Sequence, residues 1–307
     1  MMNTLFQNIA PTTRKSRINF LNKIGVNSVD DYSDLLNVNK IMNEYVLDSP
    51  NVNTQATRIF HIIEFLKVVD NKPVLVAYTN LMKQIKEDSI KKQNDTSTTD
   101  KSDRYMPLNE LQVKLVNKNP YPNFSVANAS RNMIKTYQDY LLMCLYVLNP
   151  ALRNDFHNLE LITKASKLED KGNFLVVNAR ALYIFLNDYK NSRSMGSVRI
   201  NLTDYTVAII RNLFKLYKAL KITPTTLFNH VSEKKIEPMT EDAMKKRVKA
   251  VSEQYFMKPL SINDYRHIWE IAIQNDDGYK NLNLNDREAL HQQLLHSMNT
   301  ALKYNRV

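Results

Sequence analysis

Apolar side chains recur at helical spacing in the first part of the chain. Residues 12–24 carry them on one helix face, and Gly25 follows as a helix terminator. Residues 53–66 begin at Asn53, a residue type that caps helices, and again repeat apolar positions at helical spacing. These patterns predict a small helical domain in residues 1–86.

A polar segment follows this domain. Residues 87–105 contain almost no apolar side chains, and a segment of that composition cannot bury a core. We therefore expect a linker at 87–105, with a second domain over residues 106–307.

The second domain mixes helix and strand signals. Residues 130–148 predict a long helix that ends at Asn149-Pro150, and short apolar runs at 159–163, 173–177, 182–186 and 197–202 predict strands. Four later helices have capping residues at their predicted starts: Thr203, Thr240, Ser261 and Asn285. The expected fold is mainly α with a small antiparallel β-sheet, an α+β class.

Positive charge is concentrated in the second domain. The 307 residues carry 42 Lys+Arg against 31 Asp+Glu, a net charge of +11. Residues 1–110 hold 14 Lys+Arg and 13 Asp+Glu, whereas residues 111–307 hold 28 and 18. A basic domain of this kind favours a polyanionic partner such as nucleic acid, although many proteins are basic for solubility alone.

Several classes of function lack support in the sequence. A single cysteine, Cys144, excludes an intramolecular disulfide, and its apolar surroundings indicate a buried structural thiol. No apolar run is long enough to span a bilayer, and no signal peptide is visible, so we expect a soluble intracellular protein without a membrane partner. Metal-ligand spacings and phosphate-binding glycine loops are also missing, so no metal and no cofactor is expected.

Four short motifs occur in order along the second domain. Pro150-Ala-Leu-Arg-Asn-Asp155 follows the long helix, and Tyr189-Lys190 lies at a hairpin tip. Arg266-His267 lies in the first turns of the helix capped by Ser261, and His296-Ser297 precedes Tyr304-Asn305. Each motif alone has an ordinary structural explanation: a helix-end cation, a solvated turn, a surface ion pair or a packed helix face.

Taken in this order, the motifs resemble the tyrosine recombinase (integrase) family, and most closely the integrase-like proteins of large DNA viruses and virophages. The resemblance implies that five residues are catalytic: Arg153, Lys190, Arg266, His296 and Tyr304. It also implies a helical, SAM-like core-binding domain at residues 1–86 and a catalytic domain at 106–307. Its partners would be double-stranded DNA and, on DNA, three further copies of the chain in a homotetramer.

One position departs from the family pattern. The first residue of the expected His-x-x-Arg motif is Asn263, which can hydrogen-bond a phosphate but cannot exchange a proton near neutral pH. His267 is a possible auxiliary residue, although it lies about 100° around the helix from Arg266. Asp155 is a second possible auxiliary residue, because it follows Arg153 closely and could orient it.

The chemistry implied for these residues is consistent. Two arginines would neutralise the phosphate oxygens, Tyr304 would form a 3′-phosphotyrosine ester, and Lys190 would protonate the leaving 5′ oxygen. The ester conserves the bond energy, so neither ATP nor a metal is required. An unbroken helix would separate His296 and Tyr304 by about 12 Å along its axis, so we expect a break near the capping residues Ser297 and Asn299.

Other interpretations stay open at this point. The chain could be a catalytically inactive DNA-binding relative, as Asn263 suggests, or a type IB topoisomerase with the same active-site set. A helical protein-interaction module is a third alternative. Thr54, Gln55 and Arg58 in the first domain are further candidates for DNA contacts, and an ordinary surface helix explains them equally well. A viral origin would place the protein in the host nucleus or a viral factory.

Overall fold

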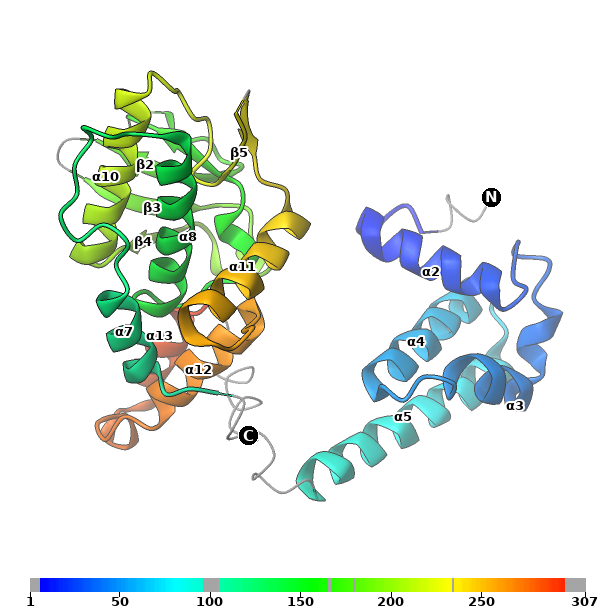
Figure 1. Cartoon of the computed structure of the whole chain (residues 1–307). Helices are drawn as coiled ribbons and strands as arrows, with labels where there is room; N and C mark the ends of the chain where they lie inside the picture. Colours follow the sequence, from blue (N-terminus) through cyan, green and yellow to red (C-terminus); the bar gives the residue numbers. More distant parts are fainter. Residues whose placement is uncertain (1–5, 96–104, 165–166, 179–180, 234, 296–307) are drawn as a thin grey trace. The chain divides into compact units, whose positions relative to one another are not determined.

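The computed structural model describes residues 6–95, 105–164, 167–178, 181–233 and 235–295 (Figure 1). The chain divides into two compact units, residues 1–97 and 98–307. Each unit has a hydrophobic core of its own.

The first unit is helical. It consists of α2 (Pro11–Lys23), η1 (Ser33–Leu36), α3 (Val38–Ile41), the single π-helical turn η2 (Met42–Val46), α4 (Val52–Val68) and α5 (Lys72–Asp95). The apolar faces predicted for 12–24 and 53–66 meet in its core, where Leu21, Ile62 and Leu66 are fully buried. Gly25 ends α2 at a φ of +87°, and a Cβ there would lie 2.6 Å from Asp34 Oδ2, so only glycine fits.

The expected linker at 87–105 is wrong over its first half. Helix α5 continues to Asp95, so the polar residues 87–95 are helical. This stretch contains neither proline nor glycine, and its Glu87, Lys91, Lys92 and Gln93 are residue types that favour helix even where no apolar face exists. A polar composition is therefore compatible with helix and does not by itself predict a loop.

The second unit is organised around one long buried helix. Its helices are α7 (Leu108–Asn117), α8 (Arg131–Val147), η3 (Asn154–Phe156), α9 (Ser192–Met195), α10 (Asp204–Ala219), α11 (Glu241–Phe256), α12 (Ile262–Gln274), η5 (Tyr279–Asn281) and α13 (Leu284–Gln292). Helix α8 packs against α7, α10, α11 and α12 (Figure 1). Cys144 is buried within α8, and burial raises the pKa of its thiol, so this side chain is a protonated core residue as predicted.

The predicted sheet is present, but it is mixed rather than wholly antiparallel. Strands β1 (Leu159–Ile162), β2 (Asn173–Val177), β3 (Leu182–Leu186) and β4 (Val198–Asn201) lie in that order. Strands β2, β3 and β4 pair antiparallel, whereas β1 and β2 are parallel, with Leu159 opposite Asn173. The connection over residues 163–172 is longer than a hairpin turn, which lets the chain return to the end where β1 began. The mainly helical α+β class is confirmed.

A separate antiparallel hairpin is formed by β5 (Asn229–Val231) and β6 (Ile236–Pro238).

Capping residues start most helices where the sequence predicts. Thr203, Thr240 and Ser261 accept hydrogen bonds from the first turns of α10, α11 and α12, and Ser261 forms a reciprocal capping box with Asp264. The predicted caps Asn285 and Asn53 are wrong by two residues, since Asn283 caps α13 and Asn51 caps α4. In both cases an asparagine two positions earlier performs the same function.

A buried amide joins the end of α8 to the start of α10. Asn149 is 2% exposed, and its Nδ2 donates to the Cys144 carbonyl at 3.0 Å and to Thr206 Oγ1 at 2.8 Å. Its Oδ1 accepts from the Thr203 amide at 2.9 Å. This joint fixes the direction in which the chain leaves α8 and enters the segment that carries Arg153.

Candidate active site

The two predicted arginines of the second unit meet at one short segment, residues 151–153. Arg266 lies in the second turn of α12 and is 1% exposed, and its Nη1 donates to the Ala151 carbonyl at 2.8 Å. Arg153 is half-buried and lies two residues after Ala151, directly before η3. The segment 151–153 follows α8 and lies against α12, and both guanidinium groups act on the charge of Asp155, so they share one region.

Asp155 experiences the charges of both arginines. Burial raises the pKa of its carboxyl, and the positive charges of Arg153 and then Arg266 oppose that shift. One carboxyl oxygen, Oδ2, is buried without a hydrogen-bond partner among the described residues. The arginine region is therefore poorly solvated, and a negative group there interacts strongly with both cations.

The hairpin tip that carries Lys190 also reaches this region. Asn191, the next residue, donates from Nδ2 to the Leu295 carbonyl at 2.8 Å, and Arg153 Nη1 donates to the same oxygen at 3.1 Å. Tyr189, the preceding residue, is buried, and the charge of Asp155 contributes to a raised pKa of its phenol after burial itself. Lys190 is exposed at this turn. The Leu295 carbonyl therefore joins the first arginine to the hairpin at the residue immediately before His296.

Aromatic side chains of α8 and α12 hold the segment that carries Arg153. The Tyr146 hydroxyl donates to the Arg153 carbonyl at 3.0 Å, and its ring stacks on Tyr265 with centroids 5.5 Å apart. Trp269 Nε1 donates to the Tyr146 carbonyl at 2.8 Å. Sequence reasoning missed Tyr146, because it lies in the apolar run of α8 and has no motif of its own. Asn191 was also missed, although it follows the Tyr189-Lys190 motif directly.

The remaining predicted residues of the second unit are placed differently. Asn263 is exposed in the first turn of α12. The His267 ring stacks on Tyr105, with centroids 5.7 Å apart, and Tyr105 lies at the start of the described part of the second unit. Both stay predictions as auxiliary residues. His296 and Tyr304, together with the expected break near Ser297 and Asn299, lie outside the described residues.

In the first unit, the three candidate DNA contacts line or flank the start of α4. Arg58 forms an ion pair with Asp48, and its Nη1 donates to the Tyr45 carbonyl at 2.8 Å, so this cation holds the preceding loop. Gln55 Nε2 donates to the Ser49 carbonyl at 2.7 Å. Thr54 is half-buried beside a cavity that Arg58 also lines. A DNA-binding role for these side chains stays a prediction.

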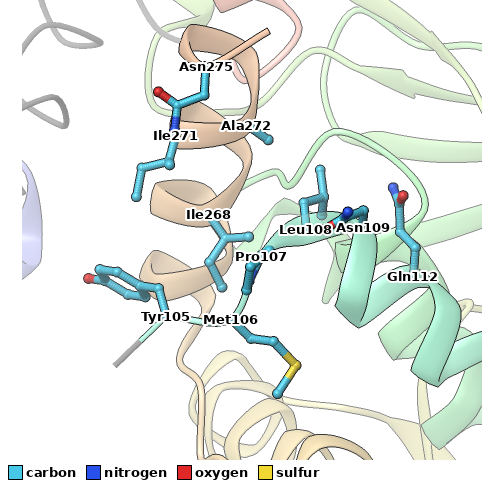
Figure 2. A pocket seen from close by; sticks show the side chains of 10 residues that line it. All are labelled: Tyr105, Met106, Pro107, Leu108, Asn109, Gln112, Ile268, Ile271, Ala272 and Asn275. Atoms are coloured by element: carbon cyan, nitrogen blue, oxygen red, sulfur yellow. The ribbon is translucent and has the colours of Figure 1, made fainter. Parts of the chain in front are cut away.

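A separate cavity of about 520 Å³ lies between the start of α7 and the outer face of α12. Figure 2 shows Met106, Pro107 and Leu108 on one side and Ile268 and Ile271 on the other. Its lining contains no acid, base or histidine and none of the predicted catalytic residues. Tyr105 also lines this cavity, but the lining holds no cation to neutralise a phosphate, so the candidate chemistry belongs to the arginine region.

Comparison with known proteins adds a structural likeness to this geometry. No protein family and no curated protein matches the sequence. Among solved structures, the chain is similar to the crystal structure of XerA recombinase, with 12% identity and a TM-score of 0.43 over 99% of this chain and 93% of that chain. An assignment of function therefore depends on the arrangement of the side chains themselves.

The described ranges hold neither a candidate membrane span nor a cluster of metal-ligand side chains. None of the helices there has the length and hydropathy to cross a bilayer. Among the described side chains, no group of three His, Cys, Asp or Glu residues is placed to share a metal ion.

Asp155 makes stability depend on pH in a definite direction. Burial raises the pKa of its carboxyl above the ordinary value of 3.8, so the folded protein holds this proton more tightly than the unfolded chain. The stability that Asp155 contributes is therefore full below pH 3.8 and is lost as the pH rises through the raised pKa.

In Asp155→Asn this loss is absent. The free energy of unfolding of the variant minus that of the wild type should therefore increase between about pH 4 and pH 7. Urea unfolding of both proteins at several pH values in this window measures the difference. A difference that is constant, or that decreases as pH rises, would contradict the placement of Asp155 in a desolvated site.

Proposed function

We propose that this protein is a DNA strand transferase of the tyrosine recombinase type, which cuts duplex DNA and rejoins it through a phosphotyrosine link. The observation that carries the proposal is the shared oxygen at Leu295. Arg153 and Asn191 both donate to this carbonyl, so the first arginine, the lysine hairpin and the residue before His296 meet at one point. Arg266 joins them through the Ala151 carbonyl.

The residues of this region have the properties that phosphodiester cleavage requires. Two fixed guanidinium groups in a poorly solvated site neutralise the charge that develops on the non-bridging oxygens, and they need no reorganisation to do so. The phenol oxygen of Tyr304 attacks phosphorus and its proton passes to water. The bond to the 5′ oxygen breaks as Lys190 supplies a proton to that oxygen. Attack of a 5′ hydroxyl on the tyrosyl ester reverses the step and rejoins the strand.

The arginine region is covered in the structure. Arg266 is 1% exposed, and a backbone carbonyl occupies one donor of Arg153. In our proposal, the DNA phosphate replaces the Leu295 carbonyl on Arg153 and gains access to Arg266 as it does so. The Ala151 carbonyl keeps the Arg266 guanidinium in position, and Tyr146 holds the backbone of Arg153, so the phosphate meets a segment that is already fixed once the cover has moved.

The biological use that fits this chemistry is site-specific integration or resolution of mobile or viral DNA, with four protomers on two DNA duplexes. Asn263 supports a second candidate, a DNA-binding relative that has lost cleavage. The family pattern has a histidine there, and asparagine cannot relay a proton. The two candidates differ only in whether a covalent bond to DNA forms.

The full chain incubated with a pool of nicked duplexes of random sequence should form a protein–DNA adduct that survives denaturation, with the nucleotide linked to Tyr304. The nick lets the short cleaved end diffuse away, so the adduct accumulates. Mass mapping of the adduct after proteolysis identifies the linked residue.

DNA binding without any adduct would leave the inactive DNA-binding relative as the remaining candidate. Relaxation of supercoiled plasmid by the monomer would indicate a type IB topoisomerase instead. If replacing Arg153 and Arg266 left DNA binding and its salt dependence unchanged, the arginine region would have no DNA role.

A further inference from the structure

Three buried or half-buried polar side chains connect α12, η5 and α13 in a continuous relay. Glu270 of α12 and His291 of α13 are both 0% exposed, and His291 Nδ1 lies 2.7 Å from Glu270 Oε1. The other ring nitrogen, His291 Nε2, lies 2.8 Å from the Tyr279 hydroxyl of η5. None of these residues belongs to the proposed cleavage site.

Helix α13 depends on this relay for its position. All nine residues of α13 are described, and His291 is the one that is buried. Within α13, no buried apolar face holds the helix on the protein, as one does for α8 or α10. The apolar anchors Leu294 and Leu295, which are 0% and 1% exposed, come only after its end. A fully buried carboxylate and imidazole tolerate desolvation only when they are paired, so their contact restricts α13 to one placement.

Further contacts reinforce the same junction. Gln274 donates to Glu270 Oε1 from one turn later in α12. Arg287 of α13 donates from Nε to the Tyr279 carbonyl at 3.2 Å and from Nη2 to the Lys280 carbonyl at 2.6 Å. The Tyr279 ring lies between these groups, in edge contact with His291 at a centroid distance of 5.6 Å.

The end of α13 leads directly to the oxygen that Arg153 and Asn191 share. His291 precedes Leu295 by four residues, and Leu295 has a φ of +54°, a left-handed conformation that turns the chain out of the helix. This conformation is costly for leucine, so it persists only where the surroundings hold it. The relay holds the chain on one side of this turn, and Arg153 and Asn191 hold it on the other.

We infer that Glu270, His291 and Tyr279 are positioning residues, which fix α13 and thereby set where the segment with His296 and Tyr304 begins, beside the arginines. The inference rests on the proposed function. The relay touches neither DNA nor the reacting atoms, so its effect is on the geometry of the nucleophile and not on the affinity for DNA.

Two substitutions weaken the relay with little change in shape. Tyr279→Phe removes only the hydroxyl that contacts His291, and Glu270→Gln removes the charge but keeps a side chain of equal length. Glu288→Gln is the matched control, because Glu288 is exposed on the same helix α13 and undergoes the same chemical change. For each protein, single-turnover adduct formation on nicked DNA, the affinity for the same DNA, and amide hydrogen exchange over residues 284–295 are measured.

Both relay variants should form the adduct about 10- to 100-fold more slowly, the cost expected for a displacement of about 1 Å at a reacting group. Their DNA affinity should stay within twofold of the wild type, and exchange over 284–295 should become faster, while Glu288→Gln behaves as the wild type. Adduct formation that stays unchanged, or that falls only in step with DNA affinity, would overturn the positioning role. If the wild type forms no adduct, the proposed function fails separately. The relay is then judged by exchange alone, and unchanged exchange in both variants would overturn it.

Discussion

Arg266→Lys should reduce the rate of DNA strand cleavage by about 100- to 1000-fold, the usual cost of removing one fixed donor from a charge-stabilising site. The substitution keeps the positive charge beside Asp155. It loses the planar fork that lets one nitrogen hold the Ala151 carbonyl at 2.8 Å while others face a phosphate. An ammonium group on a flexible stem can satisfy one of these acceptors at a time.

The loss should appear in cleavage and much less in folding or in DNA affinity. The buried lysine still has the Ala151 carbonyl and the Asp155 carboxyl as partners, so we expect the free energy of unfolding to fall by only about 1–2 kcal/mol. Affinity for DNA depends on many cations of this basic chain, and the exchange of one cation for another changes it little.

Arg211→Lys provides the matched control, because Arg211 is exposed on α10 and undergoes the same change. Single-turnover adduct formation, urea unfolding and DNA affinity at one salt concentration distinguish the effects. Cleavage by Arg266→Lys within tenfold of the wild type would remove Arg266 from the proposed catalytic set.

Much of the fold could be predicted from local patterns. The strands at 173–177 and 182–186 and the caps Thr203, Thr240 and Ser261 lie where apolar alternation and side-chain oxygens place them. These features depend on contacts within a few residues, and the sequence contains all the partners. The error at α5 has the same origin, because polarity reports exposure and is compatible with a solvated helix.

Features that depend on distant contacts were harder to predict. The parallel pairing of β1 with β2 is decided by the direction in which the chain runs when it returns beside β1, and strand periodicity is the same in both directions. The outer edge of β1 is covered by residues 225–227, where the Leu161 amide donates to the Thr225 carbonyl at 2.9 Å. Nothing near residues 159–162 in the sequence indicates that partner.

In the candidate site, too, residues that belong to local motifs were predicted and contacts between distant segments were not. Arg153, Lys190 and Arg266 were predicted as site residues because they belong to an ordered set of motifs, and their segments lie close together, although their catalytic role stays a prediction. The Leu295 carbonyl could not be identified, because a backbone oxygen has no signature and its role comes from two side chains over 100 residues away. Glu270 and His291 were missed for a related reason, since each has an ordinary appearance until α12 and α13 are placed side by side.

The largest effect on stability is expected from Asn149→Ala, which should lower the free energy of unfolding of the second unit by about 3 kcal/mol. The substitution removes three hydrogen bonds of a side chain that is 2% exposed. It leaves the Cys144 carbonyl, the Thr206 hydroxyl and the Thr203 amide with one partner fewer inside the protein.

The same change should also slow DNA cleavage, through the path by which Asn149 is connected to the arginines. Asn149 lies two residues before Ala151, whose carbonyl holds Arg266, so a loosened joint allows this oxygen to shift.

Asn201→Ala is the matched control, because Asn201 is exposed on β4 and its contact with Arg199 Nε, at 3.2 Å, is a surface contact. Such a substitution is expected to change stability by no more than about 0.5 kcal/mol. Urea unfolding followed by tryptophan fluorescence reports on the second unit, since the single tryptophan, Trp269, lies in α12. If Asn149→Ala were no less stable than Asn201→Ala, the α8–α10 joint would not be what orients the arginine segment, and the support for Arg266 would have to come from Tyr146 and the aromatic cluster alone.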